Sequence, residues 1–148
     1  LLLGCAHNPW ESVEYVELAD ESINQIAQEA VGQIKNEFPP AQTTLGLYHL
    51  NPGAFGLAFE NALREAGYAV AQEGETKSNT YQIAYYLDRI SDTELYRLSI
   101  KIDSGYGIDR LYKHNESGDL IPATGFAVRN DKEKEALTPK VSKGVLLK

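Results

Sequence analysis

The sequence predicts an α+β domain in which two amphipathic helices pack on a small, mainly antiparallel sheet. Apolar residues recur with the period of a helix twice in the first half of the chain, and with the period of a strand throughout the second half. We expect the order helix, strand, helix and then five strands, all within one domain over residues 20–130. The 148 residues are enough for one hydrophobic core.

The first helix is predicted to begin at Asp20, whose carboxylate suits the N-cap, and Glu21 adds favourable charge to the first turn. Pro39 and Pro40 end it, because proline lacks the N–H that the helical ladder needs and disfavours helical geometry in the residue before it. One face of this helix is apolar, with Ile23, Ile26, Ala27, Ala30, Val31, Ile34 and Phe38.

A strand is predicted over residues 43–50, with Leu45 and Leu47 on one face and His49 at its end. No second ligand lies at metal spacing from His49, so we interpret His49 as a structural residue.

The second helix is predicted to start at Asn51-Pro52, an N-cap followed by proline at the first helical position, and to end at Gly67. A short strand over residues 68–71 follows. The apolar stripe of this helix consists of Phe55, Ala58, Phe59, Ala62, Leu63 and Ala66.

After a polar loop over residues 72–80, apolar residues alternate in a way that predicts a hairpin with one buried face. Strands over 106–113 and 120–130 complete an antiparallel meander, and Pro122 interrupts the last of them. The buried face of the hairpin carries Tyr81, Ile83, Tyr85, Leu87, Tyr96, Leu98, Ile100 and Ile102. The opposite face carries Tyr86, Arg97 and Lys101, and we interpret it as a solvated sheet face that is also a candidate interaction surface.

The chain opens with three leucines, Gly4 and the only cysteine, Cys5. An apolar run, small residues and then a cysteine are typical of the end of a bacterial lipoprotein signal peptide. We therefore expect residues 1–4 to be a signal-peptide remnant and Cys5 to be the lipidation site. The alternative is a buried free cysteine behind an accidental leucine run. Because the sequence has no methionine, even at position 1, we expect it to be a fragment of its gene product.

Residues 5–19 are predicted to form the lipidated cysteine and an extended linker, because they include Pro9 and show no helical period. The linker has more apolar side chains than a solvated spacer requires, and Trp10, Tyr15 and Val16 are candidate partner-binding residues. Two other interpretations stay open: Trp10 rests at the membrane interface, or the segment packs on its own domain. Residues 131–148, with five lysines and three acids, are predicted to be a flexible tail.

Charge and hydropathy limit the function classes. A net charge of -7 argues against direct nucleic-acid binding, which needs clustered Lys and Arg. No apolar run approaches the roughly 18 residues of a membrane helix, so the lipid would be the only contact with the bilayer. A single cysteine excludes an internal disulfide.

Motifs of catalysis are absent from the sequence: it contains no zinc-protease, hydrolase-elbow, phosphate-loop or dinucleotide pattern. We therefore predict a protein that is not an enzyme, with no catalytic residues, metal ligands or cofactor. The weaker alternative is acid–base work by carboxylates that cluster at turns, such as Asp88, Asp92 and Glu94.

Several stretches together resemble one known family. In the first half they are the segment ending at Cys5, Phe38-Pro39-Pro40-Ala41, and residues 52–70 with Phe55-Gly56, Ala62-Leu63-Arg64 and Ala66-Gly67-Tyr68-Ala69-Val70. In the second half they are Tyr86-Leu87-Asp88, Leu95-Tyr96-Arg97-Leu98 and Gly125-Phe126-Ala127-Val128-Arg129. Over about residues 1–130 the chain resembles the TrbH family, lipoproteins of plasmid conjugation.

The resemblance implies a periplasm-facing lipoprotein anchored in the outer membrane by Cys5, the only functional residue that transfers from the family. Ala6 after the cysteine fits outer-membrane sorting. The implied role is structural, within the mating-pair-formation type IV secretion complex. The implied partners are other transfer-channel subunits in a large hetero-oligomeric ring, with no direct contact to nucleic acid. The alternative is a regulatory or binding lipoprotein of the cell envelope that contacts a peptidoglycan enzyme.

Overall fold

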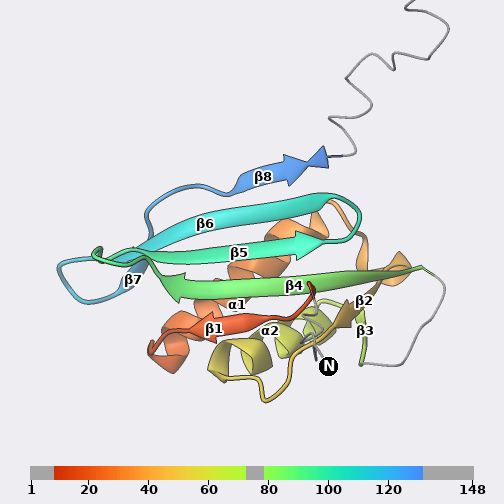
Figure 1. Ribbon diagram of the computed structural model, residues 1–148, viewed down its shortest axis with the longest axis horizontal. Helices are drawn as coiled ribbons and strands as arrows, with labels where there is room; N and C mark the ends of the chain where they lie inside the picture. The colour runs from red at the N-terminus through yellow and green to blue at the C-terminus, as the bar shows by residue number, and fades with distance from the viewer. Residues whose placement is uncertain (1–8, 73–78, 132–148) are drawn as a thin grey trace, which may run out of the picture.

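The computed structural model describes residues 9–72 and 79–131. Two helices and a mixed eight-stranded sheet make up this part of the chain, which confirms the predicted α+β class (Figure 1). The elements are β1 (Val13–Tyr15), α1 (Asp20–Lys35), the short 3₁₀ turn η1 (Pro40–Gln42), β2 (Thr44–Leu47), α2 (Ala54–Glu65), β3 (Ala69–Ala71), β4 (Thr80–Arg89), β5 (Tyr96–Ile102), β6 (Tyr106–His114), β7 (Leu120–Pro122) and β8 (Ala127–Asn130).

The sheet has the order β3-β2-β4-β5-β6-β7, with β1 also beside β4 and β8 also beside β6. Two short strands share one edge of β4: β2 pairs with its first half and β1 with its second half, both in parallel. Strands β7 and β8 share the far edge of β6 in the same manner, but antiparallel. The meander from β4 to β8 is antiparallel as predicted. The parallel pairings of β1, β2 and β3 were not predicted from the sequence.

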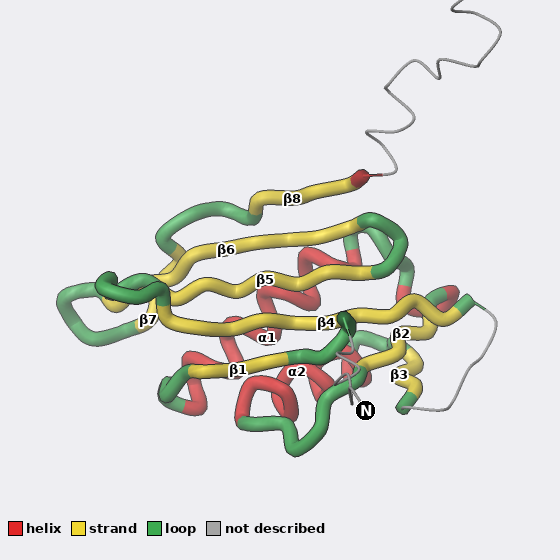
Figure 2. Tube along the Cα trace, in the orientation of Figure 1, coloured by secondary structure: helices red, strands yellow, loops and turns green. Residues whose placement is uncertain are grey.

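Both helices cover the same face of the sheet, and the other face is free of helices (Figure 2). The buried stripe of α1 and that of α2 meet the alternating apolar side chains of β4, β5 and β6, which form one core. Each fully buried large side chain contributes about 1.5–3 kcal/mol to folding. The largest are Tyr112, Phe55, Phe59, Ile26, Ile34, Leu45, Leu47, Leu63, Ile83, Leu87, Leu98 and Ile100.

The structure differs from the expected element bounds at several places. The first helix has Ala19 and not Asp20 at its N-cap, and it ends at Lys35, before Phe38. The strand expected over residues 43–50 ends at Leu47. Residues 13–15, expected within the linker, form β1 because they pair with β4. The second helix begins at Ala54 and not at Asn51-Pro52, and Gly53 precedes it without a side-chain cap. The last expected strand is two strands, because residues 123–126 leave the ladder after Pro122, although Ala123 N still donates to Leu111 O. Cys5 and residues 132–148 lie outside the described residues.

Candidate functional site

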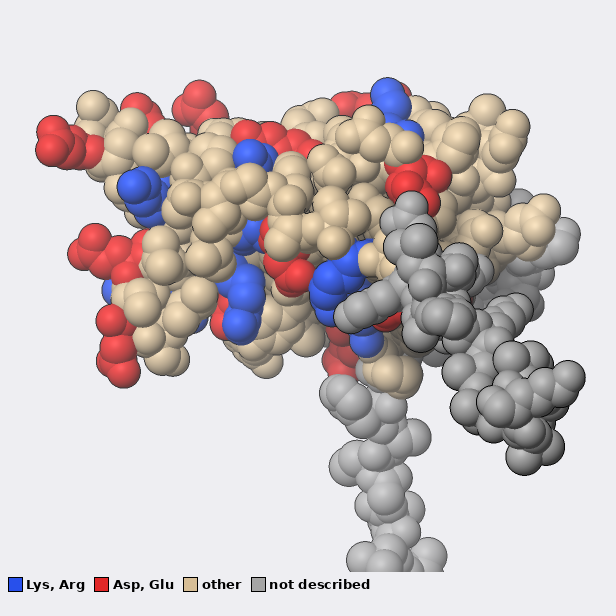
Figure 3. All heavy atoms as spheres, turned by 90° about the horizontal axis from the view of Figure 1, so that it is seen from above, with Lys and Arg blue, Asp and Glu red and all other residues tan. Residues whose placement is uncertain are grey.

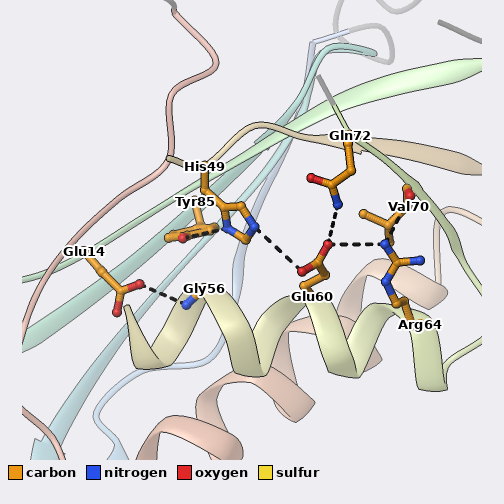
Figure 4. Close-up of polar contacts among 8 residues, drawn as sticks. All are labelled: Glu14, His49, Gly56, Glu60, Arg64, Val70, Gln72 and Tyr85. Atoms are coloured by element: carbon orange, nitrogen blue, oxygen red, sulfur yellow. Dashed lines mark hydrogen bonds and ion pairs between the residues drawn. The ribbon is translucent and has the colours of Figure 1, made fainter. Parts of the chain in front are cut away.

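Glu14 of β1 binds the first turn of α2. Its two carboxylate oxygens accept hydrogen bonds from the backbone N–H groups of Phe55 and Gly56, each at 3.0 Å. Figure 4 shows the contact with Gly56. The first N–H groups of a helix have no partner within the helix, and the helix dipole favours a negative charge there. Glu14 therefore does what a local N-cap side chain would do, and ties the first strand to the second helix.

His49, which follows β2, lies next to this contact. Its side chain is 5 % exposed, and its Nε2 lies 3.8 Å from Glu60 Oε2. Its Nδ1 lies 3.2 Å from the Tyr85 hydroxyl. Burial lowers the pKa of His49, and the opposing effect of the Glu60 and Glu14 charges is smaller. The imidazole is therefore neutral at pH 7, and its contact with Glu60 is not an ion pair there.

The Tyr85 hydroxyl keeps its proton, since burial raises the pKa of Tyr85 and the nearby charges of Glu14 and Glu60 raise it further. An ionised carboxylate can only accept, so the tautomer with the N–H on Nε2, facing Glu60, is the favourable one. In that tautomer Nδ1 accepts from the Tyr85 hydroxyl. The other oxygen of Glu60 accepts from Arg64 at 3.3 Å and from Gln72 at 2.8 Å (Figure 4).

We call these residues, Glu14, His49, Glu60, Arg64, Gln72 and Tyr85, the cap cluster. The cluster is tightly packed around α2: a Cβ at Gly56 would lie 2.3 Å from the Tyr85 hydroxyl and 2.7 Å from Pro52 Cβ. Among the described residues no three potential metal ligands gather. The polar groups of the cap cluster contact one another and the backbone of α2. The chemistry of the cap cluster is therefore that of a structural support for β1 and α2.

The helix-free side of the sheet, which we call the open face, is defined by the strand register. Side chains alternate along a strand, so neighbours on this face follow from the paired residues. Its three rows are Tyr15, Asp88, Arg97 and Leu111; Val13, Tyr86, Ser99, Asp109 and Ala127; and Ala84, Lys101, Gly107 and Arg129.

Ion pairs link the strands of the open face. Arg97 contacts both carboxylate oxygens of Asp88, at 3.2 and 2.9 Å, and its guanidinium lies 5.4 Å from the centre of the Tyr86 ring. Arg129 Nε lies 3.1 Å from Asp109, which also accepts a hydrogen bond from Ser99. Pairs this exposed contribute about 0–1 kcal/mol each, so they fix side-chain positions more than they stabilise the fold.

Lys101 lies between these pairs and the N-terminal segment. Its ammonium lies 4.6 Å from the centre of the Trp10 ring and donates to the carbonyl of Pro9. Two hollows flank it, one of about 340 Å³ that includes Trp10 and Gly107, and one of about 240 Å³ that includes Tyr86. Lys101 and Arg129 line both hollows.

The side of the molecule seen from above Figure 1 carries charges of both signs. In the view from above, Lys and Arg side chains lie among Asp and Glu side chains and do not form one continuous basic area (Figure 3). A surface of this kind, with exposed Tyr and Arg side chains, suits a protein partner.

The structure brings two of the three candidate linker residues to the open face. Tyr15 is 71 % exposed there, and Trp10 lines one hollow. Val16 instead packs against the core. Tyr86, Arg97 and Lys101 lie on the open face as the alternation predicts. Sequence reasoning missed Glu14 and Glu60. No local pattern marks Glu14, because its partners lie 41 and 42 residues away. Glu60 does have a local signal, the i,i+4 spacing to Arg64 on the same helix.

The conjugal transfer protein TrbH family matches residues 7–139, which is most of the chain. The protein belongs to this family. A search of curated proteins found no match. Among the residues that the structure describes, neither helix has the length and hydropathy needed to cross a bilayer.

Proposed function

We propose that this conjugal transfer protein is a non-catalytic outer-membrane lipoprotein that faces the periplasm and acts as a structural component of the mating-pair-formation type IV secretion complex. The family match over residues 7–139 is the observation on which this proposal rests. The geometry supports a structural role in two ways: the cap cluster is occupied by the chain's own groups, and the open face presents aromatic and basic side chains to solvent.

Anchoring is assigned to Cys5, which precedes the family match and the described residues. Each buried acyl CH₂ contributes about 0.8 kcal/mol, and a single chain binds a membrane only marginally. The several acyl chains of a bacterial lipoprotein would therefore hold the domain stably at the membrane surface.

The test is complementation of a deletion strain with the wild-type gene or with Cys5→Ser, followed by membrane fractionation, lipid labelling and counting of plasmid transfer. We expect Cys5→Ser to lose the label and the outer-membrane location, and to lower transfer. Thermal unfolding of the soluble domain serves as the control and should not change. If the deletion strain transferred its plasmid at the wild-type frequency, this result would contradict the proposed function.

A further inference from the structure

The segment before α1 is fixed to the sheet from its first described residue. The carbonyl of Pro9 accepts a hydrogen bond from Lys101, whose ammonium lies 4.6 Å from the centre of the Trp10 ring. Residues 13–15 then pair with β4, so both ends of this short segment are held. Residues 9–15 therefore belong to the folded domain and cannot act as a spacer.

This segment enters the domain at one end of the sheet. We call the turn over residues 103–105, between β5 and β6, the near end, and the turn over residues 115–119, between β6 and β7, the far end. Trp10 lies at the near end, because it lines the larger hollow together with that turn. From there the segment runs parallel to β4 toward the far end, and Tyr15 pairs with Asp88 (Figure 1).

Covalent geometry limits the distance between Pro9 and the proposed lipid anchor. Cys5 precedes Pro9 by four residues, and we call residues 5–8 the tether. An extended chain spans at most about 3.3–3.6 Å per residue, so the Cα atoms of Cys5 and Pro9 lie within about 14 Å of each other whatever path the tether takes. The nine residues of β6 span about 30 Å at ~3.4 Å per residue, so the tether is about half as long as this strand.

The short tether excludes an orientation in which the far end faces a membrane. Lys101, which holds Pro9, pairs with Gly107 at the start of β6. The strand from Gly107 to His114, at the far end, spans about 24 Å. A domain with its far end on the bilayer would therefore hold Pro9 beyond the reach of the tether.

The tether also excludes an orientation in which the helices face the membrane. Both helices cover the side of the sheet opposite the open face (Figure 2). A helix with its side chains is about 10–12 Å thick, and the sheet adds to that thickness. The tether would have to span both layers and pass around the edge of the sheet, which is more than about 14 Å allows.

We propose that the near end of the sheet lies against phospholipid headgroups, so that the strands extend away from the bilayer and the far end is the part most distant from it. The direction of residues 9–15 favours this orientation over one in which the open face lies flat, because the segment enters beside the turn over residues 103–105. Trp10, at this end, is of a residue type enriched at membrane–water interfaces. The lipid on Cys5 rests on the proposed function; the position of the near end rests on the contacts of residues 9–15.

The experiment measures how closely two labelled turns approach the bilayer. In the lipid-modified protein the only native cysteine carries the lipid, so one introduced cysteine provides the only free thiol. A fluorophore is attached to Ser104→Cys at the near end or to Ser117→Cys at the far end. Each full-length protein is reconstituted in vesicles of phosphatidylethanolamine and phosphatidylglycerol that contain a lipid with a quencher on its headgroup. We expect the near-end label to lose most of its emission and the far-end label to lose little.

Two control variants make the result specific. Gln28→Cys places the label on the exposed side of α1 and should also lose little emission. Insertion of about ten Gly and Ser residues between Ala6 and His7 lengthens the tether by about 17 Å on average and should restore the emission of the near-end label.

The quenching pattern decides the orientation. Equal quenching at Ser104→Cys and Ser117→Cys would mean that the open face lies flat, and stronger quenching at Ser117→Cys or Gln28→Cys would mean that another surface faces the bilayer. Either result would overturn the proposal, as would near-end quenching that is unchanged by the longer tether. Mass spectrometry of the same samples detects the lipid. If Cys5 carries no lipid, the proposed anchoring fails together with the orientation, whereas a lipid-modified protein with another quenching pattern contradicts the orientation alone.

Discussion

The cap cluster and the open face contain the same kinds of polar side chain, but these side chains differ in their hydrogen-bond and ion-pair partners. In the cap cluster, Glu14 and Glu60 accept hydrogen bonds from groups of the chain itself, and the His49 side chain is nearly buried. On the open face, Lys101 and Arg129 line hollows that face solvent. Buried polar groups need partners, whereas exposed ones remain available to another molecule. The first region thus holds the domain together, and the second is the one suited to binding.

The largest loss of stability is expected for Glu14→Ala. The change leaves the N–H groups of Phe55 and Gly56 without their acceptor, and hydrogen bonds to a charged group are among the stronger ones. We expect the free energy of unfolding to fall by about 2–3 kcal/mol in urea titrations. Glu17→Ala, the same change at an exposed position, is the matched control and should stay within about 0.5 kcal/mol. Equal effects of the two variants would show that Glu14 does not clamp β1 to α2.

A second comparison uses one substitution at two helical glycines. Gly56→Ala puts a methyl group against the Tyr85 hydroxyl and Pro52, and we expect a loss of about 1–2 kcal/mol from overpacking. Gly32→Ala in α1 meets nothing within 4 Å and should stabilise by about 0.5–1 kcal/mol, since alanine is the better helix former. Thermal unfolding followed by circular dichroism measures both. If both variants shifted the melting temperature in the same direction, the cap cluster would not be packed as described.

The cap cluster also predicts a dependence of stability on pH. The pKa of His49 is lowered below its ordinary value of 6.5, so below pH 6.5 the unfolded chain binds a proton that the folded chain resists. The contribution to stability is complete above pH 6.5 and is lost as the pH falls toward the lowered pKa of the folded state. The test is the difference between wild type and His49→Gln in urea titrations from pH 7.5 to 5. Parallel profiles would show that burial does not keep His49 neutral.

The smallest effect on stability is expected on the open face. Trp10→Ala combined with Tyr15→Ala removes a ring that is 71 % exposed and a cation–π contact with Lys101, which contributes about 0.5–1 kcal/mol at an exposed site. Plasmid transfer should nevertheless fall, because Trp10 and Tyr15 are candidate partner-binding residues that lie on the open face. The melting temperature and the mating frequency are measured on the same variant. An unchanged mating frequency would exclude Trp10 and Tyr15 as partner-binding residues.

Sequence patterns correctly predicted the helices and strands that form because of residues close together in the chain. The stripe from Ile23 to Ile34 and the alternation along β4 and β5 are visible in a short window, so both helices and the open-face positions of Arg97 and Lys101 could be predicted. The pairing of β1 with β4 joins residues more than 70 positions apart, and three residues are too few to show a period.

The start of α2 illustrates the same limit. Asn51-Pro52 has the sequence of a helix start, but the capping carboxylate comes from Glu14 of another strand, and the helix begins at Ala54. Likewise, the approach of Arg129 to Gly107 depends on the pairing of β8 with β6, and no sequence motif predicts that pairing. Only the packed chain brings these groups together.

The most direct test of the structural role is affinity purification of the full-length, lipid-modified protein from donor membranes in mild detergent, followed by sizing and mass spectrometry. We predict recovery in a very large particle that contains other transfer proteins. Recovery of the wild-type protein as a small species, or together with a peptidoglycan enzyme, would contradict the account.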